Sequence, residues 1–230
     1  IASAAAPPGL QWIAPFAATE PSFTRMPFNA PLFILFSSGT TGLPKCILHG
    51  IGGTLLQHLK EHRLHCDLRP GDRLFFYATA SWMMWNWTAS ALASGATLVL
   101  YDGSPFFPGP ARLWDMAAEL GITHFGTSPR YLDTLRAEGF RATQTLAALR
   151  MVLSTGAPLP PSAFAYVYQA LAPRAQLASI SGGTDIISCF LLGNPTLPVY
   201  PGLLQSPGLG MDVRLYDEAG AETEGPGELV

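Results

Sequence analysis

Short apolar runs alternate with helical stretches along most of the 230-residue chain, and this alternation limits the fold more than any other feature. Runs that are apolar throughout are typical of strands buried on both faces of a parallel sheet, and helices between them favour right-handed crossovers. The sequence therefore predicts an α/β fold with a mostly parallel sheet and flanking helices. The expected strands are 32–36, 74–78, 97–101, 123–126, 150–154 and 176–180. The expected helices are 54–65, 83–93, 111–120, one from near Tyr131, and 162–171.

The pattern divides the chain into three parts. Residues 1–30 are rich in Ala and Pro and predict an irregular lead-in, residues 31–195 form the α/β core, and residues 196–230 begin a β-rich segment. In that segment 212–216 alternates like a half-buried strand, and a further strand begins at 227–230 with no visible partner in the sequence. We therefore expect the β-rich segment to be truncated.

Composition excludes several classes of protein. Charged residues make up 13% of the chain and the net charge is −3, so no nucleic-acid partner is expected. Cys46, Cys66 and Cys189 match neither a disulfide framework nor a zinc template, which predicts a reducing, cytoplasmic location. No charge lies between Arg73 and Asp102, but polar residues divide the stretch into strand, helix and strand, so no membrane span is expected.

The run Ser-Ser-Gly-Thr-Thr-Gly-Leu-Pro-Lys at 37–45 is the strongest local signal. Its glycines allow the backbone to approach an anion, its hydroxyls and amides can donate to phosphate oxygens, and Lys45 adds a positive charge. A Walker A loop would place Ser or Thr where Cys46 stands, so a standard P-loop NTPase is disfavoured. The other alternative is a polar surface loop. We predict a phosphate-binding loop.

This run resembles the phosphate-binding loop of the adenylate-forming superfamily, which includes acyl-CoA synthetases, luciferases and peptide-synthetase adenylation domains. Further stretches are similar to the acetoacetyl-CoA synthetases within it, and the similarity covers nearly the whole chain from about Phe23. The resemblance implies part of an adenylate-forming N-terminal domain. The stretches that carry it are 42–50, 52–62, 82–87, 100–105 and 181–185.

The resemblance implies an ATP-dependent acid–thiol ligase. Acetoacetate, or a similar short carboxylic acid, would attack the α-phosphorus of ATP, and the acyl group would pass from AMP to CoA, with Mg²⁺ as cofactor. Because the carboxylate is already ionised at neutral pH, preorganised donors and cations matter more than a general base. The partners implied are these small molecules, and the oligomeric state stays open. The ribose-binding residue and the C-terminal-domain lysine would lie outside this chain, so the fragment is not expected to be fully active alone.

Site residues follow from the same resemblance. Thr184 and Asp185 resemble a Thr-Glu pair in which the hydroxyl approaches phosphate and the acid binds Mg²⁺, directly or through water. Taken alone, the pair favours a turn or helix cap, but its position after the expected strand 176–180 favours a functional role. With Lys45 they form the implied catalytic set. The phosphate set is Ser37, Ser38, Gly39, Thr40, Thr41, Gly42 and Lys45. The adenine and AMP set is Gly156, Ala157, Pro158, Ser181, Gly182, Gly183 and Thr184. Without the resemblance, an ordinary strand-to-helix loop would explain 156–158 equally well.

Acyl specificity is expected at Trp82, Asn86 and Gly182. Acetyl-specific relatives carry a large indole at the position that matches Gly182, so glycine implies room for a longer acid. Trp82 and Asn86 could donate hydrogen bonds to a 3-keto oxygen, although aromatics at helical spacing are usually core, and Trp87 is assigned to the core.

Two rival functions remain. One is a non-catalytic remnant that binds nucleotide and serves only in association. The other is a zinc metallopeptidase, because His58, Glu61 and His62 match an H-x-x-E-H pattern, with His65 one turn later on the same face. A solvated helix face is the simpler explanation of that pattern.

Overall fold

A five-stranded parallel sheet forms the centre of the protein in a computed structural model, which describes residue 20, residues 22–37 and residues 42–230. The strand order is β4-β3-β5-β6-β7, and each neighbouring pair runs parallel. The predicted α/β fold is confirmed. The strands are β3 (Arg73–Phe76), β4 (Thr97–Val99), β5 (His124–Thr127), β6 (Met151–Ser154) and β7 (Gln176–Ser179).

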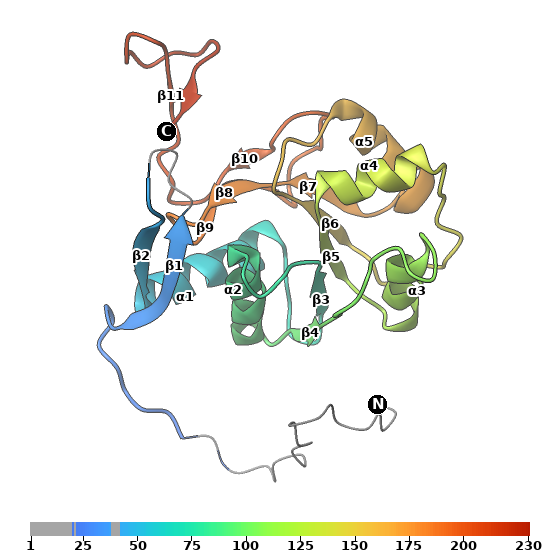
Figure 1. Cartoon of the computed structure of the whole chain (residues 1–230), viewed down its shortest axis with the longest axis horizontal. Coiled ribbons are helices and arrows are strands. Elements are labelled where there is room, and N and C mark those ends of the chain that lie inside the picture. Colours follow the sequence, from blue (N-terminus) through green and yellow to red (C-terminus); the bar gives the residue numbers. More distant parts are fainter. Residues whose placement is uncertain (1–19, 21, 38–41) are drawn as a thin grey trace.

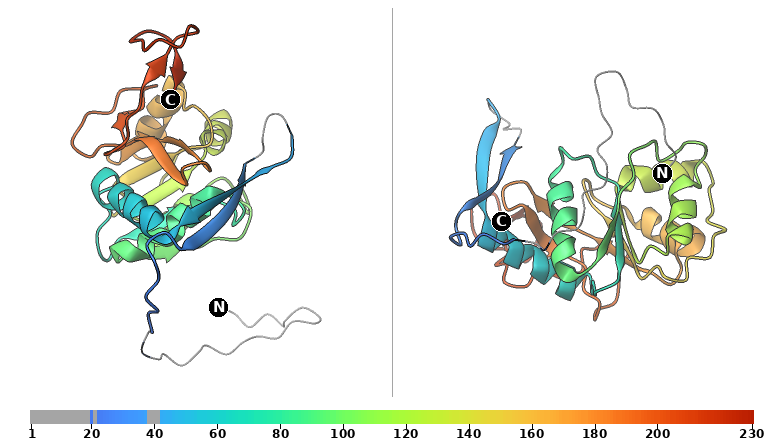
Figure 2. Two further views of the ribbon diagram at one scale, coloured as in Figure 1. Left: turned by 90° about the vertical axis from the view of Figure 1, so that its left-hand side faces the viewer. Right: turned by 90° about the horizontal axis from the view of Figure 1, so that it is seen from below.

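Helices cover both faces of this sheet (Figure 1). The chain leaves β3 for β4 on one side and then returns past β3 to β5, so right-handed crossovers place the helices on opposite faces. Helices α1 and α2 lie on one face, and α3, α4 and α5 lie on the other (Figure 2). The bounds are α1 (Ile51–Lys60) with a π-helical turn (Glu61–His65), α2 (Met83–Ser90) with a 3₁₀ turn (Ala91–Ser94), α3 (Arg112–Glu119), α4 (Pro129–Ala137), and α5 (Pro161–Tyr166) with a π-helical turn (Val167–Leu171).

Alternating side chains of the strands build two separate cores. Phe75 packs into the core beneath α3, α4 and α5, where Trp114 stacks on Phe125 with ring centroids 4.7 Å apart. Leu74 and Phe76 point to the other face and pack with α2. Since both faces bury apolar side chains, these strands need the nearly continuous apolar runs that the sequence shows.

The first strand differs from the prediction. Residues 32–36 were expected in the parallel sheet, but β1 (Pro31–Ser37) pairs antiparallel with β2 (Lys45–Gly50) in a hairpin that stands off from the sheet (Figure 2). Phe33 and Leu35 pack on the α2-side core, whereas Ile34 and Phe36 are 57% and 65% exposed. The prediction was wrong because an apolar run indicates a strand but does not say which strand it pairs with.

The end of the described chain also corrects an expectation. The last strand, β12 (Glu228–Leu229), pairs antiparallel with β11 (Leu215–Tyr216), so it has the partner that the sequence did not reveal. Reciprocal backbone bonds between Arg214 and Val230, at 2.8 and 2.9 Å, extend the pair. Before it, β8 (Ser181–Gly183), β9 (Ser188–Leu192) and β10 (Ser206–Pro207) form a three-stranded antiparallel sheet in the order β10-β9-β8.

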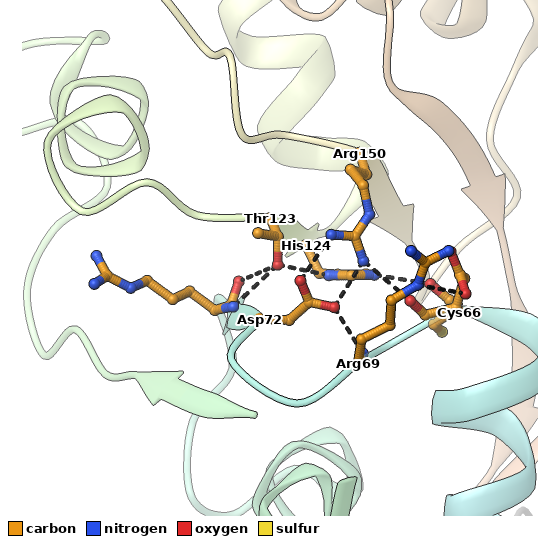
Figure 3. Close-up of polar contacts among 8 residues, drawn as sticks. Cys66, Arg69, Asp72, Thr123, His124 and Arg150 are labelled. Carbon is orange, nitrogen blue, oxygen red and sulfur yellow. Dashed lines mark hydrogen bonds and ion pairs between the residues drawn. The ribbon is translucent and has the colours of Figure 1, made fainter. Parts of the chain in front are cut away.

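A polar cluster ties together the amino-terminal ends of the parallel strands (Figure 3). Asp72, just before β3, accepts two hydrogen bonds of 2.7 Å from the guanidinium of Arg150, just before β6, and another of 2.7 Å from the Arg69 amide. Burial favours the neutral Asp72 carboxyl, but these bonds outweigh it, so the pKa of Asp72 lies below its usual value. His124, the first residue of β5, donates from Nε2 to the Cys66 carbonyl at 2.8 Å. The loops that follow the carboxyl-terminal ends of these strands lie at the opposite edge of the sheet.

No helix in the described ranges is long and apolar enough to cross a membrane.

Candidate active site

A cavity of about 490 Å³ opens at the carboxyl ends of β3, β6 and β7. Open parallel sheets bind ligands at this edge, beside the point where the strand order reverses, which here lies between β3 and β5. Residues from four separate stretches of the sequence therefore meet around one space. The lining residues are Trp82, Met83, Met84, Thr155, Gly156, Ala157, Pro158, Leu159, Ser179, Ile180, Ser181, Gly182, Gly183, Thr184, Ser188, Cys189, Gly202 and Leu204.

The turn after β6 lines the cavity where the adenine-contacting residues were expected. Gly156 has φ +95°, a conformation that favours glycine, and its missing Cβ would lie 3.5 Å from the indole of Trp82. Thr155 donates from Oγ1 to the Ile180 carbonyl at 2.8 Å, which joins the loop after β6 to the loop after β7. Gly156, Ala157 and Pro158 are all exposed, so their backbone is accessible to a ligand.

The segment after β7 forms the facing wall, and Ser181, Gly182, Gly183 and Thr184 all line the cavity. A Cβ on Gly182 would lie 2.0 Å from the Ser188 carbonyl oxygen and 2.5 Å from Cys189 Cα, both backbone atoms of β9. Glycine is therefore required here by the close pairing of β8 with β9. The structure gives this residue a packing reason that the sequence interpretation, based on room for a longer acid, did not contain.

A four-residue turn joins β8 to β9 and carries the predicted phosphate and magnesium residues. Thr184 lines the cavity, and its carbonyl accepts a 2.9 Å hydrogen bond from His49 Nε2 on β2. Asp185 follows and is exposed. No cluster of three or more His, Cys, Asp or Glu in the described part of the chain could hold a metal. One exposed carboxylate fits Mg²⁺, which usually takes one or two carboxylates plus substrate phosphates and water.

The phosphate loop joins β1 to β2. Ser37 and Lys45 face each other across the hairpin at its two ends, and Gly42 is exposed. Ser38, Gly39, Thr40 and Thr41 lie outside the described residues. The hydrogen bond from His49 connects this hairpin to the Thr184 turn, so the two predicted phosphate-binding segments are linked.

Only two of the three residues predicted to set acyl specificity line the cavity. Trp82 and Gly182 line the cavity, whereas Asn86 lies further along α2, is buried, and is not part of the lining. Trp87 is fully buried in the core, as expected. Sequence reasoning missed Met83 and Met84, which supply apolar surface to the cavity from the first turn of α2. Their position immediately after Trp82 was the available signal. The other missed lining residues are Leu159, Ser179, Ile180, Ser188, Cys189, Gly202 and Leu204.

The H-x-x-E-H pattern is not a solvated helix face, and that interpretation was wrong. His58, Glu61 and His62 are each 0% exposed. Burial lowers the pKa of His58, and burial together with His58 lowers that of His62 to about 3, so both rings are neutral near pH 7. Glu61 accepts hydrogen bonds from Trp87 Nε1 at 2.7 Å and from the Cys189 amide at 3.2 Å. Its carboxylate is thus occupied by protein donors rather than free for catalysis.

Fold and cavity together define an α/β protein with a ligand-sized cavity at the carboxyl edge of its parallel sheet. The chain belongs to the AMP-binding enzyme family, whose model matches residues 5–230.

Within this family, the chain is similar to acetoacetyl-CoA synthetases. The chain is 57% identical over 222 residues to an acetoacetyl-coenzyme A synthetase of Rhizobium meliloti, covering 95% of this chain and 34% of that protein. It is 51% identical over 216 residues to an acetoacetyl-CoA synthetase of Mus musculus, and the match covers 93% of this chain and 32% of that protein. A solved acetoacetyl-CoA synthetase from Streptomyces lividans superposes with a TM-score of 0.86 at 47% identity, over 93% of this chain and 34% of that one. The chain spans about a third of the length of these relatives.

Proposed function

We propose that this chain provides the nucleotide- and acyl-binding core of an ATP-dependent acid–thiol ligase that activates acetoacetate or a similar short carboxylic acid. The observation that carries the proposal is the cavity, where the turns after β6 and β7 converge. Its volume of about 490 Å³ suits part of a nucleotide together with a small acid. The names of the relatives support acetoacetate as the acid.

In the proposed first step, a carboxylate oxygen forms a bond to the α-phosphorus of ATP, and pyrophosphate leaves with the electron pair of the broken P–O bond. Thr184 and Lys45 would donate to phosphate oxygens, and Asp185 would hold Mg²⁺ directly or through water. When bound, Mg²⁺ neutralises phosphate charge. In the second step the CoA thiolate attacks the acyl carbon, and AMP leaves.

Met83 and Met84 favour an acyl position at the first turn of α2, because they are the buried apolar side chains of that wall. Trp82 lies between this wall and Gly156. The proposal therefore places the acid near α2 and the nucleotide along the turns after β6 and β7.

The test measures pyrophosphate release by the full-length protein with ATP, Mg²⁺ and CoA, and with acetoacetate, acetate, butyrate or no acid. Release should require an acid, and acetoacetate should give the highest kcat/KM. Thr184→Ala should lower kcat/KM by about tenfold or more, the effect of losing one contact to a charged group. Thr143→Ala, at an exposed position outside the cavity, is the matched control. Equal ATP hydrolysis with and without acid would reject a ligase in favour of a hydrolase.

A further inference from the structure

The buried His58 ring connects helix α1 to the turn that carries Thr184 and Asp185. Its Nε2 lies 2.5 Å from the Ile187 carbonyl oxygen, which can only accept, so Nε2 donates. Its Nδ1 lies 2.9 Å from Ser90 Oγ at the end of α2. One ring therefore joins the β8–β9 turn to the helix whose first turn forms the other side of the cavity.

Glu61, one turn after His58, also connects the β8–β9 region to helix α2. Its carboxylate accepts from Trp87 Nε1 on α2 at 2.7 Å, and from the Cys189 amide of β9 at 3.2 Å. The Ser188 hydroxyl donates to the same carboxylate. Ser188 and Cys189 line the cavity, so the fully buried Glu61 fixes the β9 side of the cavity through hydrogen bonds without lining it.

The segment held in this way is strained. Ile187, the last residue of the turn, has φ +49°, an uncommon conformation for a β-branched residue. Residues kept in such conformations persist only where surrounding contacts over-determine them, and they cluster at functional sites. Ile187 is fixed by the His58 bond at its carbonyl and by a 3.2 Å bond from its amide to the Thr184 carbonyl.

We propose that His58 and Glu61 are positioning residues that clamp the β8–β9 turn, so that Thr184 and Asp185 are held in place for the phosphates of Mg-ATP. The identity of that ligand rests on the proposed function, whereas the clamp itself rests on the hydrogen bonds. Neither residue touches the substrate. They act through Ile187 and through the β9 backbone.

His124 offers a matched control. It is fully buried, its Nε2 donates to a backbone carbonyl (Cys66) at 2.8 Å, and its Nδ1 lies 2.8 Å from a hydroxyl (Thr123). These partners are of the same kinds as those of His58. Yet His124 lies at the amino-terminal edge of the sheet, among the polar cluster of Figure 3, and outside the cavity lining.

The experiment compares His58→Leu, His58→Gln and His124→Leu in the full-length protein. The first readout is hydrogen exchange of a peptide spanning residues 184–187 without ligand, and the second is the KM for Mg-ATP set against kcat and the KM for the acid. His58→Leu should speed exchange and raise the KM for Mg-ATP by about tenfold each, since a buried carbonyl loses its donor. His58→Gln keeps a donor and should restore part of both. His124→Leu should lower the melting temperature without changing either readout by more than about twofold.

Unchanged exchange at 184–187 in His58→Leu would overturn the clamp, as would an equal rise in the KM for Mg-ATP in His124→Leu. If the parent protein shows no acid-dependent pyrophosphate release, the proposed function fails, and exchange still decides the clamp. If His58→Leu does not fold, Glu61→Gln gives the same comparison, because it keeps the shape of the side chain while weakening the acceptor for Trp87 and Cys189. Faster exchange in the β8–β9 segment then supports the clamp, and parental exchange rejects it.

Discussion

Replacing Gly182 with Ala should destabilise the protein, while the same change at Gly183 should not. A Cβ on Gly182 would lie 2.0 Å from the Ser188 carbonyl oxygen, whereas carbon–oxygen contacts are normally about 3.3 Å or longer. Both neighbouring atoms are backbone, so β8 and β9 must part by about 1 Å. Overpacking costs about 1–3 kcal/mol, and a clash with backbone atoms belongs in the upper part of that range, at about 2–3 kcal/mol. Alanine also stiffens the unfolded chain, which offsets up to about 1 kcal/mol of the lost stability. The net loss of folding stability should therefore be about 1–2 kcal/mol.

Gly183 is the adjacent control. A Cβ there would meet only Asp185, at 3.8 Å and 4.0 Å, which is ordinary contact. Thermal unfolding of both variants should show a melting temperature lower by about 2–8 °C for Gly182→Ala and within about 2 °C of the parent for Gly183→Ala. Equal shifts for the two variants, or no shift at Gly182, would refute the described pairing of β8 with β9. Gly182→Trp should therefore force β8 and β9 apart, and its effect on activity should not be limited to a shorter acyl pocket.

Two further predictions concern charge. Lys45→Ala should raise the KM for ATP by about 10- to 100-fold, because one charge-assisted contact to phosphate is lost. Lys60→Ala is the control and should leave this KM unchanged, since the Nζ of Lys60 donates to the Leu209 carbonyl at the surface. If steady-state kinetics of both variants match the parent, Lys45 is a solvated surface residue. The folded protein should lose stability as pH falls through the range governed by His62, whose pKa is about 3 when folded and about 6.5 when unfolded. Because the unfolded chain binds more protons between these values, the His62 contribution present above pH 6.5 declines by about 2 kcal/mol by pH 5. Denaturant titrations of parent and His62→Phe at pH 7 and pH 5 test this, and an identical pH dependence in the two proteins would contradict it.

The parallel sheet could be predicted from the sequence because its signals are local. Strands such as β3 and β6 are buried on both faces, so their runs must be apolar throughout, and the helices between them mark the crossovers. The turn residues at 156–158 and 181–184 could be placed at one edge for the same reason, since the carboxyl ends of parallel strands lie together. The hydroxyls, glycines and lysine at 37–45 predict phosphate binding through their chemistry alone, and this stays a prediction.

Other features depend on partners that are distant in the chain. The apolar run at 32–36 specifies a strand, but whether it joins the sheet or forms a hairpin depends on what covers it. His58 and Glu61 look like an exposed polar face until residues 187–189, more than 120 positions away, supply their hydrogen-bond partners. From the sequence, Gly182 indicates free space in an acyl pocket, but in the structure the backbone of β9 lies against it. The local sequence determined which runs form the strands of the parallel sheet and which turns lie at its carboxyl edge, whereas tertiary structure decided which neighbours the polar and glycine residues met, because pairing and polar satisfaction are long-range properties.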